Sequence, residues 1–200
     1  MSPGFEAPDH QLAANAVAGD ERAFARLIAR HKDGLYRFIR RYTGNPDDAY
    51  DLLQETFAAA WTALKRYDPE RPFPTWLRSI ALNKCRDWSR RRAVRRWLTR
   101  SDPIDSQAGL NLADDGPSPE ASVVELQRLA RLDRAVANLP AGLKEPLILT
   151  ALEELSQEEA GRILGLTAKA VELRVYRARK ALAEALARDD ARPPGARDEP

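Results

Sequence analysis

The sequence predicts an all-α protein made of two small helical domains joined by a flexible acidic linker. Apolar residues recur at the spacing of amphipathic helices through most of the 200-residue chain, and no alternating run predicts a strand. A stretch rich in Asp, Ser, Gly and Pro interrupts this pattern. We expect an N-terminal domain over residues 1–98, a linker over 99–122, a C-terminal domain with a helix-turn-helix over 123–188 and a disordered tail over 189–200.

Three helices are expected in the N-terminal domain. The first begins after Asp20, a favourable N-cap, and ends at the turn of residues 43–46. The second begins near residue 47 and buries one apolar stripe, which is Ala49, Leu53, Phe57, Ala60 and Leu64. The prolines of residues 68–74 exclude a continuous helix there. A third helix begins at Thr75, sends Trp76 and Trp88 toward the core and continues into a run of arginines.

Residues 155–182 predict two helices joined by a tight turn. Ser156 is placed to cap the first helix, and Gly165 tolerates the left-handed conformation that closes it. The second helix has an apolar and a basic face, made respectively of Val171, Val175, Ala178 and Leu182 and of Lys169, Leu173, Tyr176, Arg177 and Lys180. Such a helix fits the major groove of duplex DNA. The alternative is an ordinary helical hairpin with a solvated basic face.

Charge is strongly segregated, although the net charge is only +2. Eight Lys and Arg residues crowd positions 84–100, whereas positions 101–125 contain acids and no Lys or Arg. This asymmetry indicates a nucleic-acid surface followed by an acidic connector. Trp76, Trp88 and Trp97 are interleaved with the basic residues and could stack on unpaired bases. The alternative is a solvated helix end whose tryptophans belong to the core.

Other classes of function find no support in the residues. Cys85 is the only cysteine, so no disulfide forms within the chain, and no Cys/His spacing predicts a metal site. His31 lies on an apolar helix face without a recognisable carboxylate partner, as expected of a core residue. No phosphate-binding loop or nucleophile elbow is present, so we expect no enzyme and no cofactor. The chain shows no signal peptide or membrane span, and we expect a cytoplasmic protein.

Four segments resemble one protein family in the same order. Residues 47–61, DDAYDLLQETFAAAW, resemble the part of bacterial sigma factors that binds core RNA polymerase. Residues 19–45, GDERAFARLIARHKDGLYRFIRRYTGN, precede it, and FPTWLRSIALNKCRDWSRRR follows at residues 73–92. The helix-turn-helix of residues 155–182 completes the set. The chain is identified as a member of the extracytoplasmic-function (ECF) sigma factors, which keep only the second and fourth sigma-70 domains.

The resemblance implies that the N-terminal domain has two partners. The largest polymerase subunit would be bound through its clamp helices by Asp48, Asp51, Leu52, Gln54 and Glu55. The loop of residues 65–75 and the helix after it would capture the melted nontemplate strand of the minus-ten element, where a base leaves the stack and enters a protein pocket. The residues expected to contact this strand are Arg71, Trp76, Asn83, Lys84, Asp87, Arg90 and Arg91. Among them, Asn83 matches a family position that hydrogen-bonds the captured base.

The resemblance also implies that the C-terminal domain reads the minus-thirty-five element as duplex. Its expected contacts are Lys169, Glu172, Leu173, Arg174, Tyr176, Arg177 and Lys180. Glu172 and Leu173 depart from the usual basic and hydroxyl residues, and Tyr50 replaces an acid in the polymerase-binding pattern. These departures predict altered base preferences and an altered polymerase contact.

Further partners are implied for the rest of the chain. The acidic linker would thread through the polymerase toward the RNA exit path, although for any individual acid a solvated spacer is an equal alternative. The second-largest polymerase subunit is therefore an expected partner as well. An anti-sigma factor is the expected regulator. Two other functions remain open: a stand-alone helix-turn-helix regulator, and a sigma-like decoy that sequesters an anti-sigma protein.

Overall fold

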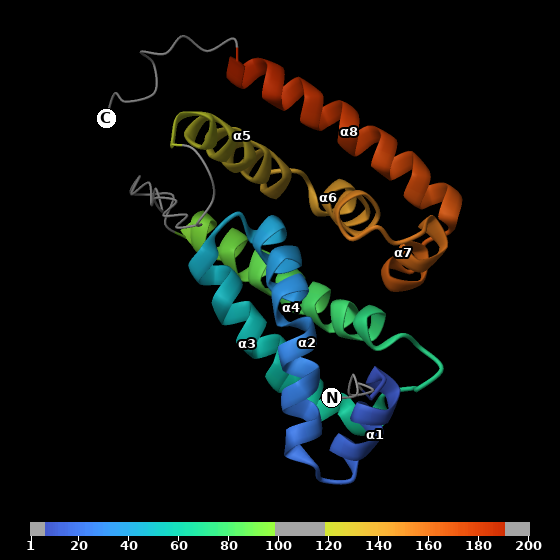
Figure 1. Ribbon diagram of the computed structural model, residues 1–200. Helices are drawn as coiled ribbons and strands as arrows, with labels where there is room; N and C mark the ends of the chain where they lie inside the picture. Colours follow the sequence, from blue (N-terminus) through green and yellow to red (C-terminus); the bar gives the residue numbers. More distant parts are fainter. Residues whose placement is uncertain (1–6, 99–118, 191–200) are drawn as a thin grey trace. The chain divides into compact units, whose positions relative to one another are not determined.

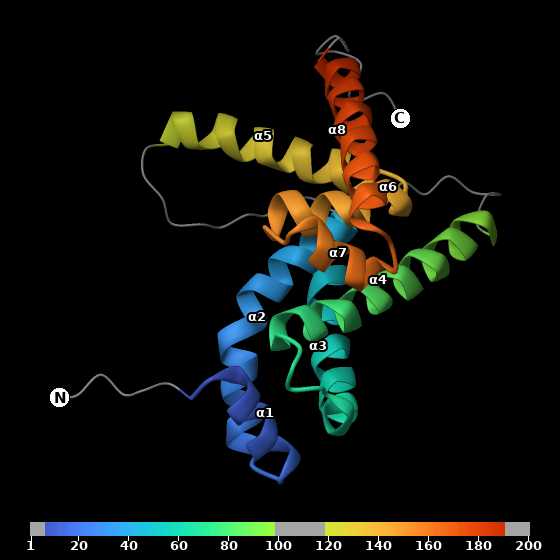
Figure 2. The same cartoon turned by 90° about the vertical axis from the view of Figure 1, so that its right-hand side faces the viewer.

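The computed structural model describes residues 7–98 and 119–190, which divide into two compact units (Figures 1 and 2). The described residues are helical with no strand, which confirms the all-α prediction. The expected linker falls largely in residues 99–118, and the expected tail largely in residues 191–200, both outside the described residues.

The first unit contains α1 (Asp9–Val17), α2 (Glu21–Thr43), α3 (Pro46–Ala63), the 3-10 turn η1 (Leu64–Arg66) and α4 (Phe73–Leu98). The Asp20 carboxylate accepts hydrogen bonds from the backbone N–H groups of Arg22 and Ala23 at 2.9 and 3.2 Å, and it caps α2 as the sequence predicts. Gly44, at a φ of 73°, ends α2 in the left-handed conformation. The Asn45 side chain then accepts from two backbone N–H groups and caps α3.

Helix α1 is absent from the sequence prediction. Only nine residues long, it begins after Pro8 without a side-chain cap, so neither cap chemistry nor a long apolar stripe marks it. It packs on α2 and η1 and buries Leu12, Ala13 and Ala16. Figure 1 shows it as the dark-blue helix beside α2.

The core of the first unit lies where α2, α3 and α4 pack against one another. Four of the five residues expected to be buried on the second predicted helix are buried, but Leu53 is only half-buried and its neighbour Leu52 is 2% exposed. Both leucines border the same apolar stripe, and spacing alone does not say which border the adjoining helices cover. Helix α4 begins at Phe73, two residues before the expected start.

The second unit contains α5 (Pro119–Ala137), α6 (Ala141–Leu147), the π-helical turn η2 (Ile148–Leu152), α7 (Gln157–Leu164) and α8 (Ala168–Asp190). Helix α5 therefore begins inside the segment that was expected to be linker. Helix α8 packs against α5, α6 and α7. Between α5 and α6, the buried Lys144 side chain donates from Nζ to the Ala137 carbonyl at 2.8 Å and so satisfies an orphan acceptor at the end of α5.

The predicted helix-turn-helix is present in α7 and α8. Ser156 and Glu159 form a reciprocal capping box at the start of α7, and Gly165 closes it at a φ of 69°. The inward face of α8 buries Val171, Val175 and Ala178, while the fourth expected residue, Leu182, is half-buried. Local cap and turn chemistry thus determines the geometry of this motif.

Candidate functional site

Helix α3 directs the five expected polymerase-binding residues in three directions. Gln54 is exposed on the outer face of the helix, and Asp51 is exposed at the edge of α3 that borders α4. Leu52 is buried among the core residues. Asp48 and Glu55 turn toward α4 and lie, together with Leu52 and Asp51, in a hollow of about 700 Å³ between the two helices.

Asp48 and Glu55 are both engaged by side chains of α4. Trp88 donates from Nε1 to Asp48 Oδ1 at 3.0 Å, and Arg92 Nη1 lies 4.0 Å from the other oxygen of that carboxylate. Two turns along α3, Glu55 lies 3.4 Å from Lys84 Nζ and 3.9 Å from an Arg91 nitrogen. These partly exposed ion pairs add little stability by themselves. They bring the expected polymerase-binding acids together with two expected minus-ten residues.

The remaining expected minus-ten residues lie in the loop before α4 and on the exposed side of α4 itself. Arg71 is exposed in the loop, and its backbone carbonyl accepts a hydrogen bond from the Tyr67 hydroxyl at 2.7 Å. Asn83 is exposed on α4, and one turn further Asp87 pairs with Arg90. The amide of Asn83 therefore faces solvent, as contact with a DNA base requires.

The tryptophans interleaved with the basic residues have different environments. Trp76 is half-buried in a cluster with Tyr67 and Phe73, with ring centroids 5.1 and 5.4 Å away. Trp88 is buried and donates its indole N–H to the Asp48 carboxylate. Trp97 is 71% exposed at the end of α4. Of the three, only Trp97 presents its ring openly for stacking on a base.

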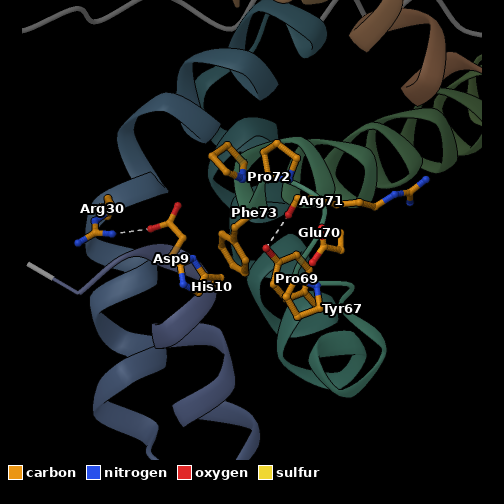
Figure 3. Close-up of a pocket in the computed structure, with 10 residues that line it drawn as sticks. Asp9, His10, Arg30, Tyr67, Pro69, Glu70, Arg71, Pro72 and Phe73 are labelled. Carbon is orange, nitrogen blue, oxygen red and sulfur yellow. Dashed lines mark hydrogen bonds and ion pairs between the residues drawn. The ribbon is translucent and has the colours of Figure 1, made fainter.

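A hollow of about 540 Å³ lies between α1 and the loop before α4 (Figure 3). Asp9 stands at its edge, where its carboxylate pairs with Arg30 at 2.5 Å and lies 2.8 Å from His31 Nε2. His31 therefore has a carboxylate partner, contrary to the sequence analysis, because the unpredicted helix α1 brings Asp9 to it. Burial, followed by the charges of Asp9 and Asp68, raises the pKa of Tyr67 on the loop.

The outer face of α8 presents most of the expected minus-thirty-five contacts. Exposed side chains on it are those of Lys169, Glu172, Leu173, Tyr176, Arg177 and Lys180, whereas Arg174 is half-buried. Lys169 Nζ pairs with the Glu172 carboxylate at 2.8 Å, three residues along the helix. Leu173 is 47% exposed and Tyr176 is 68% exposed. A hydrophobic side chain at this position can contact a thymine methyl but cannot hydrogen-bond a base edge.

Among residues 7–98 and 119–190, His, Cys, Asp and Glu side chains form no group of three that could hold a metal ion. None of the described helices combines the length and apolar character needed to cross a membrane.

Two helical units, with a basic helix in the first and a helix-turn-helix in the second, define a multidomain DNA-binding protein. Comparison with known families refines this class. Residues 27–95 match Sigma-70 region 2, and residues 129–182 match Sigma-70 region 4. Helix α1 lies before the first match.

Individual relatives agree with these matches. The RNA polymerase sigma factor CnrH of Cupriavidus metallidurans is 42% identical over 94% of this chain and 98% of its own length. The ECF RNA polymerase sigma factor SigW of Bacillus subtilis is 32% identical over 84% and 91%. The chain therefore belongs to the ECF sigma factors of the sigma-70 family, a family of transcription regulators.

Solved structures show the same relationship. CnrH in complex with the cytosolic domain of CnrY matches 90% of this chain and 98% of its own, with 38% identity and a TM-score of 0.65. The sigma factor RpoE of Bartonella quintana, in complex with the anti-sigma factor NepR, matches 83% and 98%, with 26% identity and a TM-score of 0.66.

Proposed function

We propose that this sigma factor binds core RNA polymerase through the outer face of α3 and directs it to promoters that it recognises with α4 and α8. The observation that carries the proposal is the exposed polar face of α3, where Asp51 and Gln54 point to solvent in a segment that resembles the polymerase-binding region. An exposed carboxylate and amide suit a partner helix that carries basic and polar side chains. Asp48 and Glu55 would support this surface from the α4 side.

The two promoter elements would be read by different physical means. On α8, Arg177 and Lys180 would bind phosphates or guanine edges in duplex DNA, and Leu173 would contact a thymine methyl. On α4, Asn83 would hydrogen-bond a base flipped out of the melted strand, with Trp97 as a stacking surface. The chain would supply specificity, and the polymerase would supply catalysis, so we assign it no catalytic residue or cofactor. It would act where the polymerase acts, in the cytoplasm.

Control by an anti-sigma factor is part of the proposal. The relative RpoE is described bound to the anti-sigma factor NepR, and the two chains share their fold along most of their length. A similar protein would hold this chain inactive by covering surfaces needed for polymerase or promoter binding. The alternatives of a stand-alone regulator and of a decoy explain no feature of the structure better.

The test of the proposed function is binding to sigma-free bacterial core polymerase. We expect the chain to co-elute with the core in gel filtration and to be displaced by a housekeeping sigma factor. Asp51→Ala should weaken this binding, whereas Asp33→Ala, which removes another exposed acid, on α2, should not. Promoter binding without any core binding would favour the stand-alone regulator.

A further inference from the structure

A chain of side-chain contacts joins α1 to the loop that precedes α4. Asp9, the first residue of α1, uses both of its carboxylate oxygens: one pairs with Arg30 Nη1 at 2.5 Å, and the other lies 2.8 Å from His31 Nε2. The ring of His31 in turn meets that of Phe73, with centroids 5.5 Å apart and planes tilted by 39°. Figure 3 shows Asp9 on α1 and Phe73 at the start of α4 lining the same hollow.

An aromatic cluster made of Tyr67, Phe73 and Trp76 brings the two ends of this loop together. Tyr67 directly follows η1, and Phe73 is the first residue of α4. Their rings pack edge to face, with centroids 5.4 Å apart and planes at 83°. Across the loop, the Tyr67 hydroxyl donates to the Arg71 carbonyl at 2.7 Å. Residues 68–72 therefore form a closed loop whose position depends on where the aromatic cluster lies.

Helix α1 supports the loop at two points. It packs on η1, just before the loop, and through Asp9 it orients the His31 ring that lies against Phe73. The hydrogen bonds inside the loop are local, such as that from the Arg71 N–H to the Asp68 carbonyl at 3.0 Å, so they shape the loop without joining it to α2. Without the Asp9 carboxylate, His31 would lose the partner that sets the direction of its ring.

The contacts of Asp9 suit the placement of a loop better than the stability of the unit. The side chains of Asp9, Arg30 and His31 are 20%, 27% and 16% exposed, and partly exposed ion pairs add little to the free energy of unfolding. Binding depends more steeply on geometry, because a displaced group loses much of its effect on a bound partner. A loop that is already ordered also loses less conformational entropy when it captures a strand.

We propose that Asp9 is a positioning residue for capture of the melted minus-ten strand: through His31 it holds the loop of residues 67–73 in the conformation that receives the strand. This inference rests on the proposed function and deepens it, because it gives α1 a part in promoter opening. Asp9 itself contacts no DNA in this arrangement. It acts on the loop, whose exposed Arg71 is an expected DNA contact.

The experiment uses the full-length chain with core polymerase and a promoter selected from random DNA, labelled with 2-aminopurine beside the captured base so that fluorescence reports strand opening. Asp9→Ala should lower the opening equilibrium constant about 3- to 10-fold, the effect of losing one hydrogen bond. Asp9→Asn, whose amide oxygen still accepts from His31, should recover most of that loss. Glu21→Ala, which removes an exposed acid at the start of α2, is the matched control and should open the promoter normally. Core binding should be the same for all of these chains.

Two further measurements distinguish placement of the loop from general destabilisation. Hydrogen exchange in Asp9→Ala should become faster in peptides that cover residues 64–76 and stay unchanged in peptides from α3. In a His31→Ala background, Asp9→Ala should cause no further loss of opening, because both residues act through the same contact. Faster exchange throughout the first unit, or additive losses in the double variant, would overturn the positioning role.

The outcomes also separate this inference from the proposed function. If the unmodified chain neither binds core polymerase nor opens promoters, both are wrong. If Asn83→Ala impairs opening and Asp9→Ala does not, only the role of Asp9 is wrong. Opening by Asp9→Asn as poor as that by Asp9→Ala would exclude the hydrogen bond to His31 as the link between α1 and the loop.

Discussion

Gly161 is the position in the helix-turn-helix where a single methyl group should cost the most. A Cβ atom added there would lie 2.6 Å from the backbone oxygen of Leu166, well inside van der Waals contact, and the obstacle is backbone rather than a flexible side chain. The Gly161 carbonyl also accepts a hydrogen bond from the Leu166 N–H at 2.9 Å, so the turn cannot move away without weakening that bond. Gly161→Ala should therefore separate α7 from the turn that leads into α8.

The expected cost of Gly161→Ala is about 1–3 kcal/mol of the unfolding free energy of the second unit, typical of overpacking in a close-packed interior. Alanine regains up to about 1 kcal/mol of helix propensity, which reduces but does not cancel this cost. Gly142→Ala is the matched control, because no atom lies within 4 Å of its added Cβ. That control should change the stability by no more than about 1 kcal/mol, and in the favourable direction.

Hydrogen exchange of peptides from α7 and α8 measures this effect directly. All four tryptophans lie before residue 99, so tryptophan fluorescence reports the first unit alone and should show an unchanged unfolding midpoint. Duplex DNA binding should fall in Gly161→Ala, and core-polymerase binding should remain. Exchange rates and DNA affinity equal to those of Gly142→Ala would refute the steric reasoning.

Three other substitutions test the two DNA-binding surfaces. Arg177→Ala should weaken binding to a minus-thirty-five duplex, selected from random DNA, by about 1–3 kcal/mol and leave core binding intact; a loss of core binding instead would contradict the domain assignment. Asn83→Ala should impair strand opening and minus-ten selectivity in the holoenzyme without changing duplex binding, and 2-aminopurine fluorescence measures the opening. Equal opening by the unmodified holoenzyme with every base at the captured position would exclude the role of Asn83. Replacement of the contacted thymine by uracil should cost the unmodified chain about 0.8 kcal/mol and cost Leu173→Ala nothing, whereas an equal loss in both would place the methyl contact elsewhere.

The contacts between α3 and α4 link the expected polymerase-binding surface to the expected minus-ten surface, which belong to separate segments of the sequence. Glu55 belongs to the segment that resembles the polymerase-binding region, while Lys84 and Arg91 belong to the basic helix. In the free chain these charges partly neutralise one another. A partner that draws Glu55 away would leave more positive charge on α4 for DNA, although each exposed pair contributes at most about 1 kcal/mol.

Features that depend only on residues close together in the chain are predictable without the fold. Asp20 and Ser156 cap their helices and Gly165 closes its turn as predicted, because a cap is made by a side chain and backbone groups two or three residues away. Three of the four residues predicted for the inward face of α8, Val171, Val175 and Ala178, are buried, because helical spacing places them on one stripe. Family motifs in their order then identified the sigma factor.

Which residues of α3 face outward and which face α4 depends on how the helices pack, and the local sequence does not contain that information. Asp48 and Asp51 belong to the same acidic segment, yet Asp48 accepts a hydrogen bond from Trp88, forty residues away, and Asp51 is exposed. Periodicity gives the angle between two residues around a helix, but not the direction from which other helices approach. The pairing of His31 with Asp9 has the same origin, because it needs a short helix whose stability comes from packing rather than from its own sequence.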